Sequence, residues 1–231
     1  TTEQIRLLER EEAKSSWQLS SGKNDNPFSF CFSGATFSEE DRREIDDIVA
    51  ATNYGIEVME QLPLSTRLFK QIHYLVARSP RYEKKYPGEY RTSPVWIGRV
   101  GSDLRTAQFV APVEEDMIPA ITALENYINY DNSVHPLVQA ALIHYQFEAI
   151  HPFIDCNGRV GRILNTLFLI ERGILEHPVL PISESLKRVA AQYYMLLQEV
   201  SDTGNYDMWV KFFLRMVTDS ASTSNRILTD E

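Results

Sequence analysis

Long apolar runs and an excess of positive charge are both missing from this sequence of 231 residues. No stretch approaches the roughly 18 apolar residues of a membrane-spanning helix, so we expect no transmembrane segment. The formal net charge of -9 disfavours non-specific nucleic-acid binding, which depends on lysine and arginine neutralising phosphates. A local basic pocket is still compatible with that charge.

Cysteine is also scarce, with Cys31 and Cys156 as its two occurrences. Two such cysteines form neither a disulfide framework nor a metal-binding spacing. Residues 1–14 are charged and lack the apolar core of a signal peptide. We therefore expect a soluble protein of the reducing cytoplasm, and the 43% of hydrophobic residues is enough for one substantial core.

Helical spacing of apolar residues dominates what is present, and strand signals are confined to one region. The periodicity predicts helices over 3–17, 38–59, 64–76, 113–129, 137–150, 158–172, 183–200 and 207–217. Two β-rich runs around a turn with Gly98 and Gly101 predict a hairpin within 90–110. The expected fold is an all-α bundle with one hairpin. We divide it into an N-terminal helix and loop (1–34), the main domain (35–217) and a C-terminal tail (218–231).

One segment concentrates polar groups just ahead of an apolar helical run: His151-Pro-Phe-Ile-Asp-Cys-Asn-Gly-Arg-Val-Gly-Arg162. A helix beginning near Asn157 presents unpaired backbone amides and the positive end of its dipole, which attract anions. Gly158 lets a phosphate approach the backbone closely. Arg159 and Arg162 are three residues apart on neighbouring helix positions, and guanidinium groups suit phosphate oxygens. The segment therefore predicts a phosphate-binding loop.

Two further side chains of this segment suit chemistry beside a polyphosphate. Asp155 offers hard oxygens for Mg²⁺, which usually takes one or two carboxylates together with substrate phosphates. His151 titrates near neutral pH and can accept a proton from a hydroxyl group. This set predicts a transfer reaction between a nucleotide polyphosphate and a protein hydroxyl.

The segment resembles the motif of the Fic family, His-Pro-Phe-x-Asp/Glu-Gly-Asn-Gly-Arg-x-x-Arg, with Cys156 in place of its first glycine. Residues 86–98 and 107–110 are similar to the segment that leads into and forms the family's target-docking flap. Residues 135–150 are similar to the helix before the motif, and the pair Tyr193-Tyr194 to tyrosines near the family's adenine pocket.

This resemblance covers roughly residues 10–215 and implies a Fic-type helical bundle with adenylyltransferase activity. AMP would pass from ATP to a Tyr, Ser or Thr hydroxyl of a target protein, with His151 as general base and pyrophosphate as leaving group. The implied cofactor is Mg²⁺. The implied binding residues are Asp155 for Mg²⁺, Asn157 for the α-phosphate, Cys156 to Gly158 for the anion hole, Arg159 and Arg162 for the outer phosphates, Gly161 beside them, and Tyr194 for the base.

The resemblance also implies partners and a role for the hairpin. Val95, Trp96, Ile97 and Gly98 would pair with extended backbone of a target protein docked on the 95–110 hairpin. Phe153 would anchor the motif loop in the core. A homodimer is compatible with the sequence, whereas neither a membrane nor a nucleic acid is an expected partner.

Two departures from the family pattern bear on activity. A side chain at Cys156 restricts the backbone if that residue needs positive φ; both a tolerated small substitution and a thiol activated by a helix N-terminus remain open. Residues 12–20 resemble the family's inhibitory helix, whose glutamate pairs with the last arginine of the motif. We expect Leu19 at that glutamate position, and because leucine cannot pair with Arg162, we expect this route of autoinhibition to be absent or rearranged.

Several residues have a simpler structural interpretation. His144, Glu148 and His151 have a spacing compatible with a metal site, but we interpret His144 as a core histidine and Glu148 as a brace of the motif loop. Trp96 fits hairpin packing as well as docking, and the tyrosine pair fits the core as well as a base pocket.

Two other functions remain open beside adenylyl transfer. One keeps the site but transfers a different nucleotide or removes AMP, although removal needs a positioned carboxylate that Leu19 does not supply. The other is a nucleotide-binding regulatory or interaction module with weak or lost catalysis, which Cys156 would explain.

Overall fold

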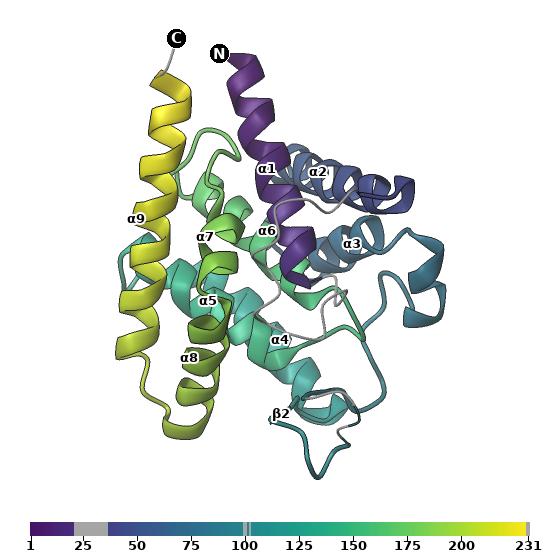
Figure 1. Ribbon diagram of the computed structural model, residues 1–231. Helices are drawn as coiled ribbons and strands as arrows, with labels where there is room; N and C mark the ends of the chain where they lie inside the picture. Colours follow the sequence, from purple (N-terminus) through teal and green to yellow (C-terminus); the bar gives the residue numbers. More distant parts are fainter. Residues whose placement is uncertain (21–36, 99–100, 102, 230–231) are drawn as a thin grey trace.

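The computed structural model describes residues 1–20, 37–98, 101 and 103–229, and Figure 1 shows a helical body with a small hairpin at one end. Most of the loop expected after Ser20 therefore lies outside the described residues. The elements are α1 (Thr2–Ser20), α2 (Glu39–Met59), α3 (Thr66–Val76), the 3-10 helix η2 (Pro80–Lys85), β1 (Trp96–Ile97), β2 (Phe109–Val110), α4 (Glu114–Tyr130), α5 (Pro136–Ile150), α6 (Asn157–Glu171), α7 (Ile182–Arg188), α8 (Ala190–Thr203) and α9 (Asp207–Thr229). The expected all-α class with one antiparallel hairpin is confirmed. Within the described residues, no helix combines the length and apolar character that crossing a membrane requires.

Helix α6 lies at the centre of the bundle and packs against α1, α2, α3 and α5. Its apolar side chains are almost completely buried, and each stabilises the fold by roughly 1.5–3 kcal/mol; among them are Val160, Leu164, Leu167 and Phe168. Helix α2 approaches so closely at Gly55 that an added Cβ would lie 2.6 Å from Leu167 Cδ1. The core therefore fixes the helix whose first turns carry the second half of the motif.

Local sequence signals account for several helix ends. Ser38 and Asp41 form a capping box at the start of α2, with reciprocal hydrogen bonds of 3.1 and 3.0 Å between side chain and backbone N–H. Helix α5 begins at Pro136, where a missing N–H costs nothing. It ends at Ile150, and the following His151 adopts left-handed backbone with φ +48. The end of α5 therefore places the motif's histidine at the first position of the loop that follows.

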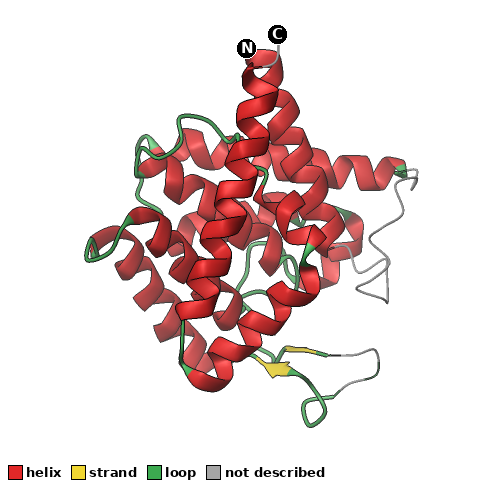
Figure 2. Cartoon of the chain, turned by 60° about the vertical axis from the view of Figure 1, so that its left-hand side comes forward, coloured by secondary structure: helices red, strands yellow, loops and turns green. Residues whose placement is uncertain are grey.

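Helix α1 is part of the core rather than a separate appendage. Its inner face is buried along its length: Leu8, Ala13, Trp17 and Leu19. The Glu12 carboxylate accepts hydrogen bonds from Ser183 at the start of α7, 2.8 Å from the N–H and 2.5 Å from the hydroxyl. Near the two termini, Gln4 Nε2 donates to the Ile227 carbonyl at 2.8 Å, and both chain ends lie at the same end of the molecule in Figure 1 and Figure 2.

Two expectations for the C-terminal part were wrong. The helix expected over 183–200 is interrupted at Val189, whose φ of -126 and ψ of 31 break the helical path between α7 and α8. The helix expected over 207–217 continues to Thr229 as α9. It remains helical because Ser220 and Ser224 are small enough to pack inward, where their hydroxyls donate to the carbonyls of Pro181 and Val179.

Candidate active site

The motif loop, residues 151–156, connects the end of α5 to the start of α6. Its two ends turn sharply, because His151 and Cys156 have φ of +48 and +61. Asn157 closes the loop: its Oδ1 accepts from the Phe153 N–H at 2.9 Å, and its Nδ2 donates to the Phe153 carbonyl at 2.8 Å. The side chain that the resemblance assigns to the α-phosphate therefore bonds to the loop's own backbone in this structure.

Phe153 anchors the loop in the core. Its side chain is fully buried and its ring stacks on that of His73, with centroids 3.8 Å apart and planes inclined by 5°. The rings of Tyr90 and Phe147 lie at 5.3 and 6.5 Å. Aromatic packing on several sides thus fixes the middle of the loop.

His151 is neutral and has one ring nitrogen available. Its Nδ1 lies 3.2 Å from the Glu148 carbonyl; because a carbonyl only accepts, Nδ1 carries the hydrogen and Nε2 is unprotonated. Burial lowers the pKa of His151 to about 4, against a smaller opposing effect of the Glu148 carbonyl. At neutral pH the ring can therefore accept a proton at Nε2.

Asp155 is the carboxylate of the loop that could hold a metal ion. Its Oδ1 accepts from the Cys156 N–H at 2.7 Å, and Oδ2 receives no hydrogen bond from the described residues. One partly exposed carboxylate fits Mg²⁺, which takes its remaining ligands from phosphates and water. Over the described ranges, no group of three or more His, Cys, Asp or Glu side chains could hold a metal, so His144, Glu148 and His151 do not form one.

Arg162 is buried, and its hydrogen bonds run to the end of α1. Nε donates to Ser16 Oγ at 2.9 Å, and Nη2 donates to the Ser16 carbonyl at 3.0 Å and to Ser20 Oγ at 2.6 Å. An added Cβ on Gly158 would lie 3.0 Å from Arg162 Nη1 and 3.3 Å from Ser20 Oγ. The guanidinium group and the Ser20 hydroxyl therefore lie together over the first turn of α6.

This geometry corrects the alignment of α1 with an inhibitory helix. Leu19 is 6% exposed and belongs to the core. Ser20 faces Arg162 instead, because it lies four residues after Ser16 on the same face of α1. Among the described residues no carboxylate forms an ion pair with Arg162, and its hydrogen bonds go to oxygen atoms of the two serines.

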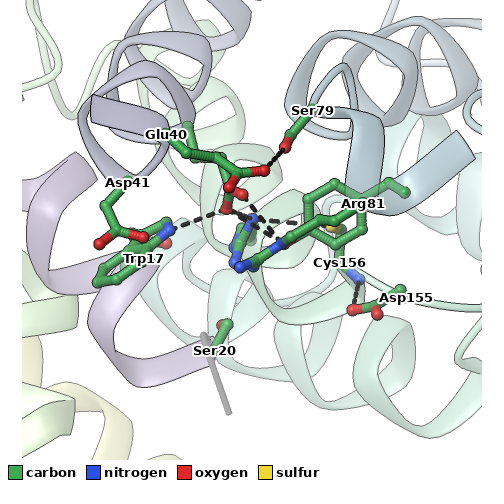
Figure 3. A network of polar contacts seen from close by, with 12 residues as sticks. Trp17, Ser20, Glu40, Asp41, Ser79, Arg81, Asp155 and Cys156 are labelled. Carbon is green, nitrogen blue, oxygen red and sulfur yellow. Dashed lines mark hydrogen bonds and ion pairs between the residues drawn. The ribbon is translucent and has the colours of Figure 1, made fainter. Parts of the chain in front are cut away.

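Arg159 points to a different environment from Arg162. Its guanidinium group is 1% exposed and lies 3.3 Å from Oε2 of the fully buried Glu44. Figure 3 shows Trp17, Arg81 and Cys156 within one network of polar contacts. Glu44 also accepts from Trp17 Nε1 at 2.9 Å and pairs with Arg81 Nε at 2.9 Å. The β-phosphate role that the resemblance implies would require Arg159 to share its donors with this buried network.

Cys156 supplies a left-handed residue but not a reactive thiol. Its side chain is 4% exposed, and its Sγ lies 3.8 Å from Arg159 Nη1. Burial raises the pKa of the thiol to about 11, although Arg159 acts in the opposite direction. The thiol therefore stays protonated at neutral pH, which argues against activation by the helix N-terminus.

Gly161 is required for close packing of α5 on α6. An added Cβ would lie 2.9 Å from Glu148 Oε1 and 3.1 Å from Phe147 Cδ1. Glu148 Oε1 is buried without a hydrogen-bond partner, and burial raises the pKa of this carboxyl group to about 7 while Arg162 lowers it. Glu148 thus lies against Gly161 of the motif helix, whereas we had expected it to brace the motif loop.

The tyrosine pair divides between core and surface. Tyr193 is 2% exposed and its hydroxyl lies 2.9 Å from His144 Nε2; His144 is itself fully buried and also meets Asn165 Nδ2 at 2.9 Å. Tyr194 is 46% exposed, with its ring 5.0 Å from that of Tyr193. Of the two, Tyr194 is the one available to a bound base.

The hairpin presents a short apolar edge beside the loop. Trp96 pairs with Val110 and Ile97 with Phe109, and no further strand joins this sheet in the described part of the chain. Trp96, Ile97 and Val110 are 42%, 41% and 46% exposed, while Val95 accepts a backbone hydrogen bond from Ala111. Gly98 lies at the exposed end of β1, and Figure 2 shows the strands set apart from the helices.

Sequence reasoning missed two residues that hold the loop from the hairpin side. Arg91 is 2% exposed; its Nε donates to the His151 carbonyl at 2.7 Å and its Nη2 to the Pro112 carbonyl at 2.5 Å. His73 donates to the loop from α3. A lone histidine or arginine in an amphipathic pattern gives no sign of such a contact, because its partners are backbone atoms distant in sequence.

Comparison with known proteins gives matches to part of the chain. Residues 63–169 match the model of the Fic/DOC family. It is 33% identical over 127 residues to "Protein adenylyltransferase Fic" of Drosophila grimshawi and 32% identical over 127 residues to that of Drosophila willistoni. These matches cover 54% of this chain but 23% and 22% of those proteins; the chain thus spans less than a quarter of the curated relatives it matches.

Solved structures support the fold over a longer stretch. A Fic family protein from Desulfovibrio desulfuricans G20 superposes with a TM-score of 0.78 at 22% identity, covering all of this chain and 68% of that one. Fic-1 (residues 134–508) from C. elegans gives a TM-score of 0.62 at 21% identity, covering 93% and 56%. At this level of identity the likeness concerns the fold.

Proposed function

We propose that this protein is an adenylyltransferase that moves AMP from ATP to a hydroxyl group of a target protein, with release of pyrophosphate. The observation that carries the proposal is the neutral His151 with a free Nε2, four residues before Asp155 and beside the anion-binding start of α6. The relatives named protein adenylyltransferase support the choice of reaction.

In the proposed reaction, His151 Nε2 takes the proton of the target hydroxyl as its oxygen attacks the α-phosphorus. The bond from phosphorus to the bridging oxygen breaks, and pyrophosphate leaves. Asp155 would hold Mg²⁺, which neutralises phosphate charge when bound. The backbone amides at the start of α6 and Gly158 would receive the phosphate oxygens.

Arg162 would bind an outer phosphate while part of its guanidinium group contacts α1. Nε and Nη2 donate to Ser16 and Ser20, so a phosphate that approaches these two atoms competes with those bonds. The Val95–Gly98 edge would pair with extended target backbone, and its apolar side chains are exposed enough to contact a second chain.

The alternative is a nucleotide-binding module without transfer. The observation that favours it is the buried ion pair of Arg159 with Glu44, which occupies one of the two arginines of the motif. AMP removal has less support, because a hydroxyl group at Ser20 cannot act as the carboxylate that prepares water.

Incubation with Mg²⁺ and isotope-labelled ATP, GTP, CTP or UTP, alone and with cell lysate, tests the proposal by mass spectrometry of protein adducts. We expect an AMP adduct that is absent from the His151→Ala variant. Binding of ATP without any adduct would favour the module, and an adduct from another nucleotide alone would reassign the donor.

A further inference from the structure

His73 contacts the motif loop through one ring face and one ring nitrogen. It lies near the end of α3 and is fully buried. One face stacks on Phe153 at 3.8 Å, Nε2 lies 3.2 Å from the Asp155 carbonyl, and Nδ1 lies 2.8 Å from the Gly88 nitrogen. No other described side chain contacts both Phe153 and the Asp155 backbone in this way.

The two partners fix the tautomer of His73. The Gly88 N–H can only donate, so Nδ1 is the acceptor. Nε2 then carries the hydrogen and donates it to the Asp155 carbonyl. Gly88 lies with φ +83 against Tyr74, whose Cβ would be 3.2 Å from an added Cβ.

The peptide unit between Asp155 and Cys156 is consequently held at both ends. Its carbonyl accepts from His73 Nε2, and its N–H donates to Asp155 Oδ1 at 2.7 Å. Rotation of this peptide would release the Asp155 carboxylate from the N–H that orients it. It would also move the first amide of the α6 N-terminus.

This peptide needs an external hold because Cys156 follows it. A non-glycine residue at φ +61 is strained by roughly 1–2 kcal/mol relative to ordinary backbone. Relief of the strain would rotate the flanking peptides. The hydrogen bond from His73 to the Asp155 carbonyl opposes that rotation. The stack on Phe153 holds the His73 ring in the orientation that this hydrogen bond requires.

We propose that His73 is a positioning residue for the proposed transfer reaction: its Nε2–H fixes the Asp155–Cys156 peptide, which in turn orients the Asp155 carboxylate and the first amide of the anion site. The role rests on the proposed function for its catalytic consequence. The orientation of the peptide is a property of the protein alone and can be measured without any reaction.

Three substitutions separate the contacts of His73. In His73→Gln, the side-chain amide nitrogen reaches the former position of Nε2 and can donate to Asp155. In His73→Asn, the shorter amide reaches the position of Nδ1 and can serve Gly88 but not Asp155. His73→Phe keeps the stack and loses both hydrogen bonds. His144→Gln is the matched control, since His144 is equally buried and uses both ring nitrogens without contacting residues 151–156.

The first readout is amide hydrogen exchange at Cys156 and Asn157 in the full chain without nucleotide, read beside the melting temperature. We expect exchange in His73→Asn and His73→Phe to be faster by about fivefold, the worth of one hydrogen bond. His73→Gln should stay near wild type, and His144→Gln should lower the melting temperature without changing exchange at these amides. Equal exchange in His73→Asn and His73→Gln would overturn the proposal, because the hydrogen bond to Asp155 would then make no difference to these amides, and faster exchange in His73→Gln would assign the effect to the contact with Gly88 instead.

The second readout is AMP transfer, resolved into kcat and the KM values for Mg²⁺ and ATP. We expect His73→Asn to raise the KM for Mg²⁺ and lower kcat by about fivefold, with partial rescue in His73→Gln. Losses that follow the melting temperature across all variants, His144→Gln included, would overturn the positioning role. If wild type shows no transfer, the proposed function fails while the exchange measurement still decides the role of His73.

Discussion

The two ends of the motif are held in opposite ways. At the His151 end, the ring Nδ1–H donates to the Glu148 carbonyl, and Arg91 Nε donates to the His151 carbonyl. These contacts leave the ring Nε2 free. At the Arg162 end, Nε and Nη2 of the guanidinium group donate to Ser16 and Ser20 of α1. The group that would do chemistry is therefore prepared, whereas the group that would bind phosphate is engaged elsewhere.

The residues that prepare the proposed base and the residues that contact the phosphate-binding arginine come from different parts of the chain. Residues that prepare His151 lie on α5 and in the segment before the hairpin, whereas the residues that engage Arg162 come from α1. Substitutions around His151 should therefore change the rate of transfer more than nucleotide affinity, and substitutions around Arg162 should change nucleotide affinity more than the rate. The following predictions use that expectation, from the largest effect to the smallest.

Removal of the imidazole should have the largest effect. His151→Ala removes the proton acceptor, and loss of general base catalysis typically costs about 10²–10⁴-fold in rate. Nucleotide affinity should change little, because the ring does not contribute to the anion site. Rates of transfer and ATP binding by calorimetry check this, and transfer near the wild-type rate would remove His151 from its role.

The thiol of Cys156 should be unreactive in the folded protein. A rise of its pKa from 9 to about 11 lowers the thiolate fraction about a hundredfold, since each unit is tenfold. In a Cys31→Ser background, labelling by a thiol reagent at pH 8 should be slower than for the denatured chain by at least that factor. Labelling at the denatured rate would mean that the start of α6 is exposed.

The pH profile should lack the fall expected of an ordinary histidine. Because burial lowers the pKa of His151 to about 4, the neutral form persists as pH falls and is lost only through that value. An unperturbed ring with pKa near 6.5 would be about 90% protonated at pH 5.5. Transfer at pH 5.5 should stay within about twofold of that at pH 7.5, and a tenfold fall would show an ordinary pKa.

Release of Arg162 from α1 should have a smaller effect than removal of the imidazole. Ser20→Ala removes one hydrogen bond from the guanidinium, so we expect ATP affinity to rise about three- to tenfold, the value of one such bond. Ser15→Ala is the matched control, because Ser15 donates to Glu184 on α7 and not to the site. Equal affinities in Ser20→Ala and Ser15→Ala would show that α1 does not compete with phosphate.

The same packing changes how the role of α1 can be tested. Deletion of residues 1–20 would remove Leu8, Trp17 and Leu19 from the core and would break the contact of Glu12 with Ser183. Loss of one such large buried side chain alone costs about 2–5 kcal/mol. Single substitutions at Ser16 or Ser20 are therefore the informative variants.

The sequence predicted elements whose signals are local. Apolar residues at helical spacing predicted the helices, including one that starts near residue 38, and two β-rich runs predicted the hairpin. The interruption at Val189 was missed because its apolar pattern continues through the break. The loop residues were readable as a motif, but the register of α1 was not: Ser20 and Leu19 differ by 100° around the helix, and packing decides which one faces Arg162.

Contacts of side chains with residues distant in the sequence could not be predicted. The pairing of Arg159 with Glu44 joins residues 115 positions apart, and His73 meets the Asp155 carbonyl across 82 positions. Neither residue type is unusual in its helix. The fold brings them together, so their roles follow only from the structure.

Transfer with label at either end of the triphosphate tests the central claim most directly. The account predicts that label in the α-phosphate of ATP becomes covalently attached to protein in the presence of Mg²⁺, while label in the γ-phosphate appears as pyrophosphate in solution. Attachment of the γ-label to protein, or retention of both labels on unreacted ATP, would contradict it.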